Sequence, residues 1–135
     1  MNKRIIILRG TQNSGKSTVA KLFGEKSIIC CADDYFTDNW GNYNFDPNLL
    51  GVAHRICREK FINALDDPDI DTIVVANTNA TQKDFQFYID SAEQHGNMVF
   101  SLVVERRHDN HNNHNVPQEA IDRCEQNIKN SLKLK

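Results

Sequence analysis

The sequence predicts a single α/β domain of three layers, with a mainly parallel sheet of about four strands. Short β-branched runs alternate with stretches of helical periodicity, which is typical of strands joined by crossover helices. Three of these runs are apolar throughout, as expected of parallel strands that are covered on both faces. A length of 135 residues suits one compact core, so we expect residues 1–135 to form one domain.

Four runs are expected to be strands, at Ile5–Leu8, Ser27–Cys31, Thr72–Ala76 and Met98–Val104. Right-handed crossovers would place the carboxyl ends of parallel strands at one edge of the sheet. Open α/β sheets bind their ligands at that edge. The residues that follow each strand are therefore the first candidates for a functional site.

Helices are expected after each strand. The stretch TVAKLF follows the first strand and its glycine-rich loop, and apolar residues then recur at helical spacing from Leu50 to Ala64. Thr81 and Asp84 form a capping-box pattern, and Gly96 suits the residue after that helix. Pro117 suits the first position of a last helix that carries Ile121, Cys124 and Ile128 on one face.

Composition limits the possible partners and compartments. A net charge of -2 gives no overall positive field for a polyanion, so any contact with nucleic acid should be local. The four cysteines lack the spacing of a zinc site or a disulfide framework, which indicates a reducing compartment. The apolar run before Arg9 has only four residues, too few for a signal peptide or a membrane span, so we expect a cytoplasmic protein without membrane contact.

The strongest motif is GTQNSGKS, which matches G-x-x-x-x-G-K-[ST] between a strand and a helix. Its glycines allow a sharp turn with inward N–H groups, and the helix N-terminus favours a polyphosphate. Lys16 would neutralise the β- and γ-phosphates, while the Ser17 hydroxyl would hold Mg²⁺. The expected nucleotide-binding residues are Gly10, Thr11, Gln12, Asn13, Ser14, Gly15, Lys16, Ser17 and Thr18.

ATP is favoured over GTP because the sequence has no guanine-reading N-K-x-D motif. The near match TQKD is better explained as the start of a helix. We therefore expect ATP and Mg²⁺ as cofactors.

The paired acids of ADDYF follow the second strand and should face the phosphate site. A carboxylate there can accept the proton of an attacking hydroxyl, as a general base does in a kinase. Adjacent residues point in different directions, so only one is expected to be catalytic. Asp33 is the favoured base, and Asp34 would bind backbone amides or a metal-bound water.

Five spaced segments together carry a family resemblance: GTQNSGKST, ADDYF, GNYNFDPNLLGVAHRICREKF, VVANTNAT and NHNNHNVPQEAI. From Ile5 to about Cys124, the chain resembles the P-loop polynucleotide 5′-kinase family, including the kinase-like domain of certain ubiquitin-ligase-binding proteins and small phage and bacterial ATP-binding proteins. The resemblance implies ATP- and Mg²⁺-dependent phosphoryl transfer to a 5′-hydroxyl of RNA or DNA.

The resemblance also assigns residues. It makes Asp33 the general base and residues 106–116 a lid over ATP. It places Asn77, Thr78 and Asn79 around the metal and its waters, and an interior position in the sheet is expected for the first strand.

The chain departs from the family at three places. His111 stands before Asn112 where the family has a lid arginine, so Arg106 or Arg107 is the expected substitute. Phe36 replaces an arginine that holds the acceptor's phosphate, which leaves Phe36 to stack on a base. Ala76 and Asn77 end the third strand where an acid would be expected.

Two other functions stay open: a kinase for a nucleoside or another small alcohol, and an ATP-binding module without catalysis. The histidines His108, His111 and His114 suit a polar lid better than a zinc site. The aromatic residues Trp40, Tyr43 and Phe45 would either stack on bases or fasten their loop to the following helix. The sequence leaves the oligomeric state unknown.

Overall fold

The computed structural model describes residues 2–12, 14–107 and 117–135. It confirms the α/β class, since four strands form one parallel sheet in the order β2-β3-β1-β4. The strands are β1 (Arg4–Arg9), β2 (Ser27–Cys30), β3 (Thr72–Val75) and β4 (Met98–Val103). β1 lies inside the sheet, as expected of the strand that leads into GTQNSGKS.

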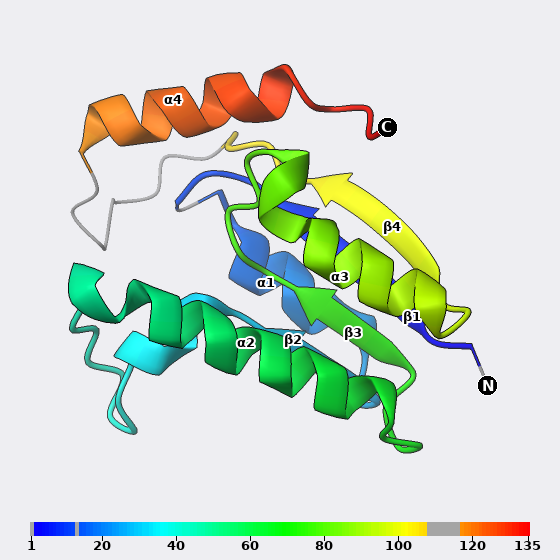
Figure 1. Ribbon diagram of the computed structural model, residues 1–135. Coiled ribbons are helices and arrows are strands. Elements are labelled where there is room, and N and C mark those ends of the chain that lie inside the picture. Colours follow the sequence, from blue (N-terminus) through cyan, green and yellow to red (C-terminus); the bar gives the residue numbers. More distant parts are fainter. Residues whose placement is uncertain (1, 13, 108–116) are drawn as a thin grey trace.

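Helices lie on both faces of the sheet, which is consistent with three layers (Figure 1). One face is covered by α2 (Leu50–Leu65) and α3 (Gln82–Gln94), and the other by α1 (Lys16–Ala20) with the 3₁₀ turn η1 (Lys21–Phe23). The last helix is α4 (Gln118–Lys129). Two further 3₁₀ turns, η2 (Ala32–Phe36) and η3 (Pro47–Leu49), lie between β2 and α2.

The alternation of side chains along β1 creates two hydrophobic cores. Ile5 and Ile7 are fully buried against α2 and α3, while Ile6 and Leu8 pack with Ala20 of α1. Successive residues of a strand point to opposite faces, so a strand inside a covered sheet must be apolar throughout. This explains why the run IIIL reads as continuous rather than alternating.

Most element boundaries fall within one or two residues of the expected ones. The capping box of Thr81 and Asp84 is present, with the Thr81 N–H donating to Asp84 Oδ2 at 3.2 Å. Pro117 precedes α4 as its N-cap residue instead of occupying its first position, and Cys124 is only partly buried on the helix. None of the described helices is long and apolar enough to cross a membrane.

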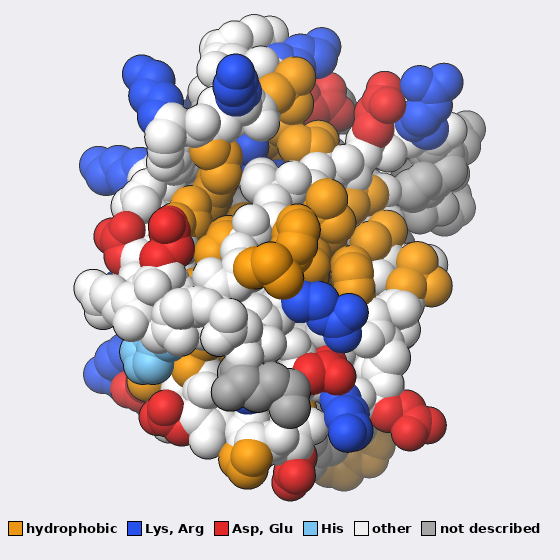
Figure 2. Space-filling view, turned by 90° about the vertical axis from the view of Figure 1, so that its right-hand side faces the viewer, with side chains coloured by type: hydrophobic (Ala, Val, Ile, Leu, Met, Phe, Trp, Pro, Cys, Tyr) orange, Lys and Arg blue, Asp and Glu red, His pale blue; other side chains and the backbone are white. Residues whose placement is uncertain are grey.

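The edge strand β4 is more exposed than its apolar sequence suggests. Met98, Phe100 and Leu102 each keep at least 40% of their surface in contact with solvent. Phe100 and Leu102 pair in register with Ile6 and Leu8, so they extend the face that the short α1 covers. Figure 2 shows hydrophobic side chains gathered in the middle of the side on which β4 lies.

Candidate functional site

A cavity of about 760 Å³ opens where β1, β2 and β3 end. The motif residues Lys16 and Ser17 line it together with Asp33, Asp34 and Asn77. A further part of the wall, here called the aromatic half, is formed by Thr37, Tyr43, Phe45, Leu50 and His54. The parallel sheet thus brings the motif and the paired acids into one cavity, as the sequence predicts.

The loop from Gly10 to Ser17 turns sharply at two glycines. Gly15 has a φ of 102°, a left-handed conformation that favours glycine, immediately before α1. A Cβ atom on Gly10 would lie 2.5 Å from Ser14 Oγ and 2.8 Å from the Val104 carbonyl oxygen. The close approach of the chain at Gly10 therefore requires the absence of a side chain.

Lys16 is held inside this loop. Its Nζ donates hydrogen bonds to the carbonyl oxygens of Gly10 at 2.7 Å and Thr11 at 2.9 Å. Burial lowers the pKa of Lys16, although the nearby Cys124, Cys31 and Asp33 oppose this shift. The loop therefore carries a partly desolvated cation, which interacts strongly with an anion.

The donors of this loop fit a polyphosphate. The hydroxyls of Thr11 and Ser14 are buried and have no hydrogen-bond partner among the described residues. Buried hydroxyls without partners are unfavourable unless a ligand or a water satisfies them. Together with Lys16, and with the Ser17 hydroxyl at the cavity wall, they form a donor set suited to phosphate oxygens and Mg²⁺.

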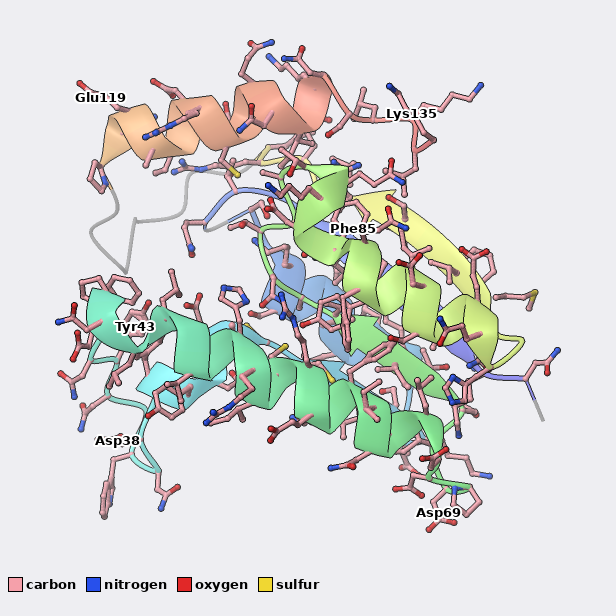
Figure 3. The ribbon with its side chains drawn as sticks, in the orientation of Figure 1. Asp38, Tyr43, Asp69, Phe85, Glu119 and Lys135 are labelled. Atoms are coloured by element: carbon pink, nitrogen blue, oxygen red, sulfur yellow. The ribbon has the colours of Figure 1, made fainter. Side chains whose placement is uncertain are left out.

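The two acids lie on η2, directly after β2. Asp33 Oδ1 accepts a hydrogen bond from the Tyr43 hydroxyl at 3.3 Å, and Figure 3 shows Tyr43 near the N-terminal end of α2. Burial raises the pKa of Tyr43 to about 12, with the Asp33 charge adding to the shift, so this hydroxyl remains a donor at neutral pH. The second carboxylate oxygen of Asp33 has no hydrogen-bond partner among the described residues.

Asp34 differs from its neighbour in its surroundings. Burial raises the pKa of Asp34, the charge of Lys60 opposes the shift, and the charge of Asp33 adds to it. The two carboxylates thus occupy different environments although they are adjacent in sequence.

Asn77 has a role that the sequence did not indicate. Its Oδ1 accepts the backbone N–H of Ala32 at 2.8 Å, so it joins the end of β3 to the turn that carries the acids. Its Nδ2 lies 3.8 Å from Cys57 Sγ of α2. Asn77 lines the cavity, but its amide serves to hold the surrounding backbone.

Two expected substrate contacts lie away from the cavity. Phe36 is only 6% exposed and packs in the core beneath the aromatic loop. Asn79 is only 2% exposed, and its Nδ2 donates to the Leu8 carbonyl oxygen at 2.7 Å. Neither side chain lines the cavity, because Phe36 is used in packing and Asn79 in backbone hydrogen bonds, so a contact of either residue with a substrate stays a prediction.

The lid is only partly described. His111 and most of the expected lid lie outside the described residues, as does Asn13 of the motif. Arg106 and Arg107 are described, and neither is among the residues that line the cavity. The exposed Arg107 side chain lies 3.2 Å from Glu105 Oε1.

Arg9 was not recognised from the sequence as part of the site. This last residue of β1 is fully buried, and its guanidinium donates to the carbonyl oxygens of Asn79, Ala80 and Ser131 and to Ser131 Oγ. The guanidinium also lies 4.9 Å from the ring centre of Phe85, near the start of α3 (Figure 3). The sequence feature that indicates a buried role for Arg9 is its position at the end of an apolar strand, directly before the loop.

Comparison with known proteins supports the fold. No family model matches the chain. It is similar to a chain in a structure of the Pnkp1/Rnl/Hen1 complex, with a TM-score of 0.61 and 19% identity over 90% of this chain and 38% of that one. A chain in a structure of the Pnkp1/Rnl/Hen1 RNA repair complex gives a TM-score of 0.58 and 20% identity, over 99% and 40%. The protein therefore spans about two fifths of these chains, and shares its fold with a part of an RNA repair assembly.

Proposed function

We propose that the protein transfers a phosphoryl group from ATP, with Mg²⁺, to a 5′-hydroxyl of RNA or DNA. The observation that carries this proposal is the placement of Lys16, Ser17 and Asp33 around one cavity. ATP would supply the phosphoryl group, and Mg²⁺ would neutralise charge on its phosphate oxygens. The likeness to chains of an RNA repair complex supports an acceptor of this class.

Each residue of the cavity has a role in this chemistry. Lys16 and the N–H groups of its loop would bind the phosphates, and Ser17 would hold the metal. Asp33 would accept the proton of the 5′-hydroxyl while that oxygen forms its bond to phosphorus. The hydrogen bond from Tyr43 fixes one oxygen of Asp33, so the other is oriented for that proton.

A kinase for a nucleoside or another small alcohol is the second candidate. Apart from Lys16, no Lys or Arg is found among the described residues that line the cavity. A long polyanionic acceptor usually requires several such contacts. This observation favours an acceptor whose part inside the cavity is uncharged.

A nucleotide-binding module without catalysis is the third candidate. It is favoured by the position of Arg106 and Arg107, neither of which lines the cavity in the described residues. Many kinases require a cation beside the transferring phosphoryl group.

Transfer of labelled phosphate from ATP to 5′-hydroxyl oligonucleotides and to nucleosides tests the proposal. Asp33→Asn should lower kcat by about 10²- to 10⁴-fold because it removes the base. Asp66→Asn, an exposed site beyond the last turn of α2, is the matched control and should keep full activity.

Thermal unfolding with a non-hydrolysable ATP analogue tests nucleotide binding separately. The analogue should raise the Tm of the wild type and of Asp33→Asn, but not that of Lys16→Ala. Stabilisation of the wild type without transfer to any acceptor would contradict the kinase proposal and favour the module. Transfer to nucleosides alone would favour the small-alcohol kinase.

A further inference from the structure

The loop between η2 and α2 is an ordered aromatic platform. Asp38 Oδ1 accepts the backbone N–H groups of Trp40 at 2.9 Å and Asn42 at 2.8 Å. Figure 3 shows Asp38 farther out on this loop than Tyr43. The Asn44 N–H donates to the Phe36 carbonyl oxygen at 2.9 Å, which fastens the returning strand of the loop to η2.

Three rings of this segment pack together and differ in burial. Phe36 is the buried anchor, and Phe45 meets it edge-on with ring centres 5.1 Å apart. The rings of Tyr43 and Phe45 are nearly parallel, with an angle of 6° between their planes and centres 6.5 Å apart. Phe45 lines the cavity and remains 50% exposed.

These aromatic residues could either stack on bases or fasten their loop, and the half-exposed ring of Phe45 favours stacking. Fastening the loop to the core is accomplished by Phe36, which is buried, and by Tyr43, which contacts it. A ring used only for fastening would be expected to bury its surface. Phe45 instead presents apolar surface to a cavity, and such rings stack on nucleobases with little preference for sequence.

The charges around the cavity exclude a phosphate from this part. The aromatic half contains no Lys, Arg, Asp or Glu among its described residues, and the carboxylates of Asp33 and Asp34 line the same cavity. Two carboxylates would repel a phosphate group, whereas an uncharged nucleobase is not subject to this charge–charge repulsion. His54, on the first turns of α2, adds a group that can hydrogen-bond to the edge of a base.

We propose that the aromatic half binds the nucleobase of the acceptor's 5′-terminal nucleoside, stacked on Phe45, and makes no contact with acceptor phosphate. The inference rests on the proposed function, because it places the base beside the carboxylate that receives the 5′-hydroxyl. Tyr43 links the two parts, since its ring packs beside Phe45 and its hydroxyl binds Asp33. The base can come from a free nucleoside or from the end of an oligonucleotide.

Fluorescence of 2-aminopurine tests the stacking without any transfer of phosphate. The probes are the free riboside and a trinucleotide with 2-aminopurine at its 5′-hydroxyl end, and stacking on Phe45 should quench both. Phe45→Leu keeps an apolar side chain and should weaken binding by about 5- to 150-fold, which corresponds to the loss of one stacked base. Trp40→Leu is the matched control: Trp40 is 85% exposed on the same loop and outside the cavity lining, so binding should not change.

The outcomes separate this inference from the proposed function. Equal quenching by wild type and Phe45→Leu, with both folded by thermal unfolding, would overturn the base site. So would a riboside 3′-phosphate that bound more than about tenfold tighter than the riboside, because it would reveal a phosphate contact.

In the transfer assay, Phe45→Leu should raise KM for the acceptor and leave both kcat and KM for ATP nearly unchanged. Transfer with an unchanged acceptor KM would leave the kinase proposal standing and remove the base site. Quenching that depends on Phe45, without transfer to any acceptor, would support the base site and contradict the kinase. Tighter binding of the trinucleotide than of the riboside, with the riboside 3′-phosphate bound no tighter than the riboside, would support the site and identify a nucleic-acid end as the source of the base.

Discussion

Asn77 Oδ1 accepts the backbone N–H of Ala32 at 2.8 Å, and this bond joins the ends of two neighbouring strands. Ala32 begins the turn that carries Asp33 and Asp34. The position of both acids relative to the Gly10–Ser17 loop therefore depends on a side chain that follows β3.

Asn77→Ala should lower the free energy of unfolding by about 1–3 kcal/mol, because the partly buried N–H of Ala32 loses its partner. Urea unfolding measures this change. Asn63→Ala, an exposed site on α2, is the control and should change stability by less than about 0.5 kcal/mol. Equal effects of the two substitutions would show that the Asn77 bond does not stabilise the turn.

Arg9→Lys should lower the free energy of unfolding by about 2–4 kcal/mol, because one ammonium cannot replace a buried guanidinium that donates to four oxygens. Thermal or urea unfolding gives the value. Arg4→Lys is the same substitution at an exposed ion pair with Asp71, and it should cost less than about 1 kcal/mol. A small effect at Arg9 would mean that water replaces the missing donors.

Stability should fall between about pH 9 and pH 12, in part because of Cys30. Burial raises the pKa of the Cys30 thiol from 9.0 to about 12, so its folded pKa lies above its unfolded one. The stability that this group contributes is complete below pH 9 and is lost as the pH rises toward 12. At pH 11 the loss should be about 2–3 kcal/mol.

Urea unfolding of wild type and Cys30→Ala at pH 8 and pH 11 checks this expectation. The variant should lose less stability between the two pH values than the wild type. The remaining loss in the variant would come from the other groups whose pKa values burial raises: Cys31, Tyr43, Tyr88 and Cys124. Identical losses would show that Cys30 does not contribute.

Tyr43→Phe should lower kcat for phosphoryl transfer by about 2- to 10-fold, the effect of losing one ordinary hydrogen bond to Asp33. KM for ATP should not change, because the hydrogen bond that is removed belongs to Asp33, the proposed base. Initial rates at varied ATP concentration test both statements. Tyr35→Phe, outside the cavity lining, is the control and should behave as the wild type.

The strands and helices could be predicted from the sequence because the patterns that mark them involve residues close together in the chain. The short, β-branched apolar run IIIL favours a strand covered on both faces, and the capping box at Thr81 marks the start of α3 in the sequence itself. The meeting of Lys16 with Asp33 also follows from a rule, since parallel strands end at a common edge.

The side chains that hold the site could not be predicted in this way. Asn77 and Arg9 bind backbone groups 45 and up to 122 residues away, and no local pattern announces such partners. Phe36 follows Asp34 by only two residues, but the 3₁₀ geometry of η2 turns it into the core. Its neighbour in space, Phe45, comes from the far end of the loop and takes the exposed position.

The guanidinium of Arg9 joins the segment just beyond α4 to the residue that precedes the Gly10–Ser17 loop. Arg9 stands directly before Gly10, and its guanidinium donates hydrogen bonds to the carbonyl oxygen and the hydroxyl of Ser131. A ligand that immobilises the loop should therefore slow amide hydrogen exchange at the end of α4, well outside its own contacts. The coupling is reciprocal: if the ligand makes fraying of the C-terminal end less favourable by some factor, fraying of that end lowers the ligand's affinity by the same factor.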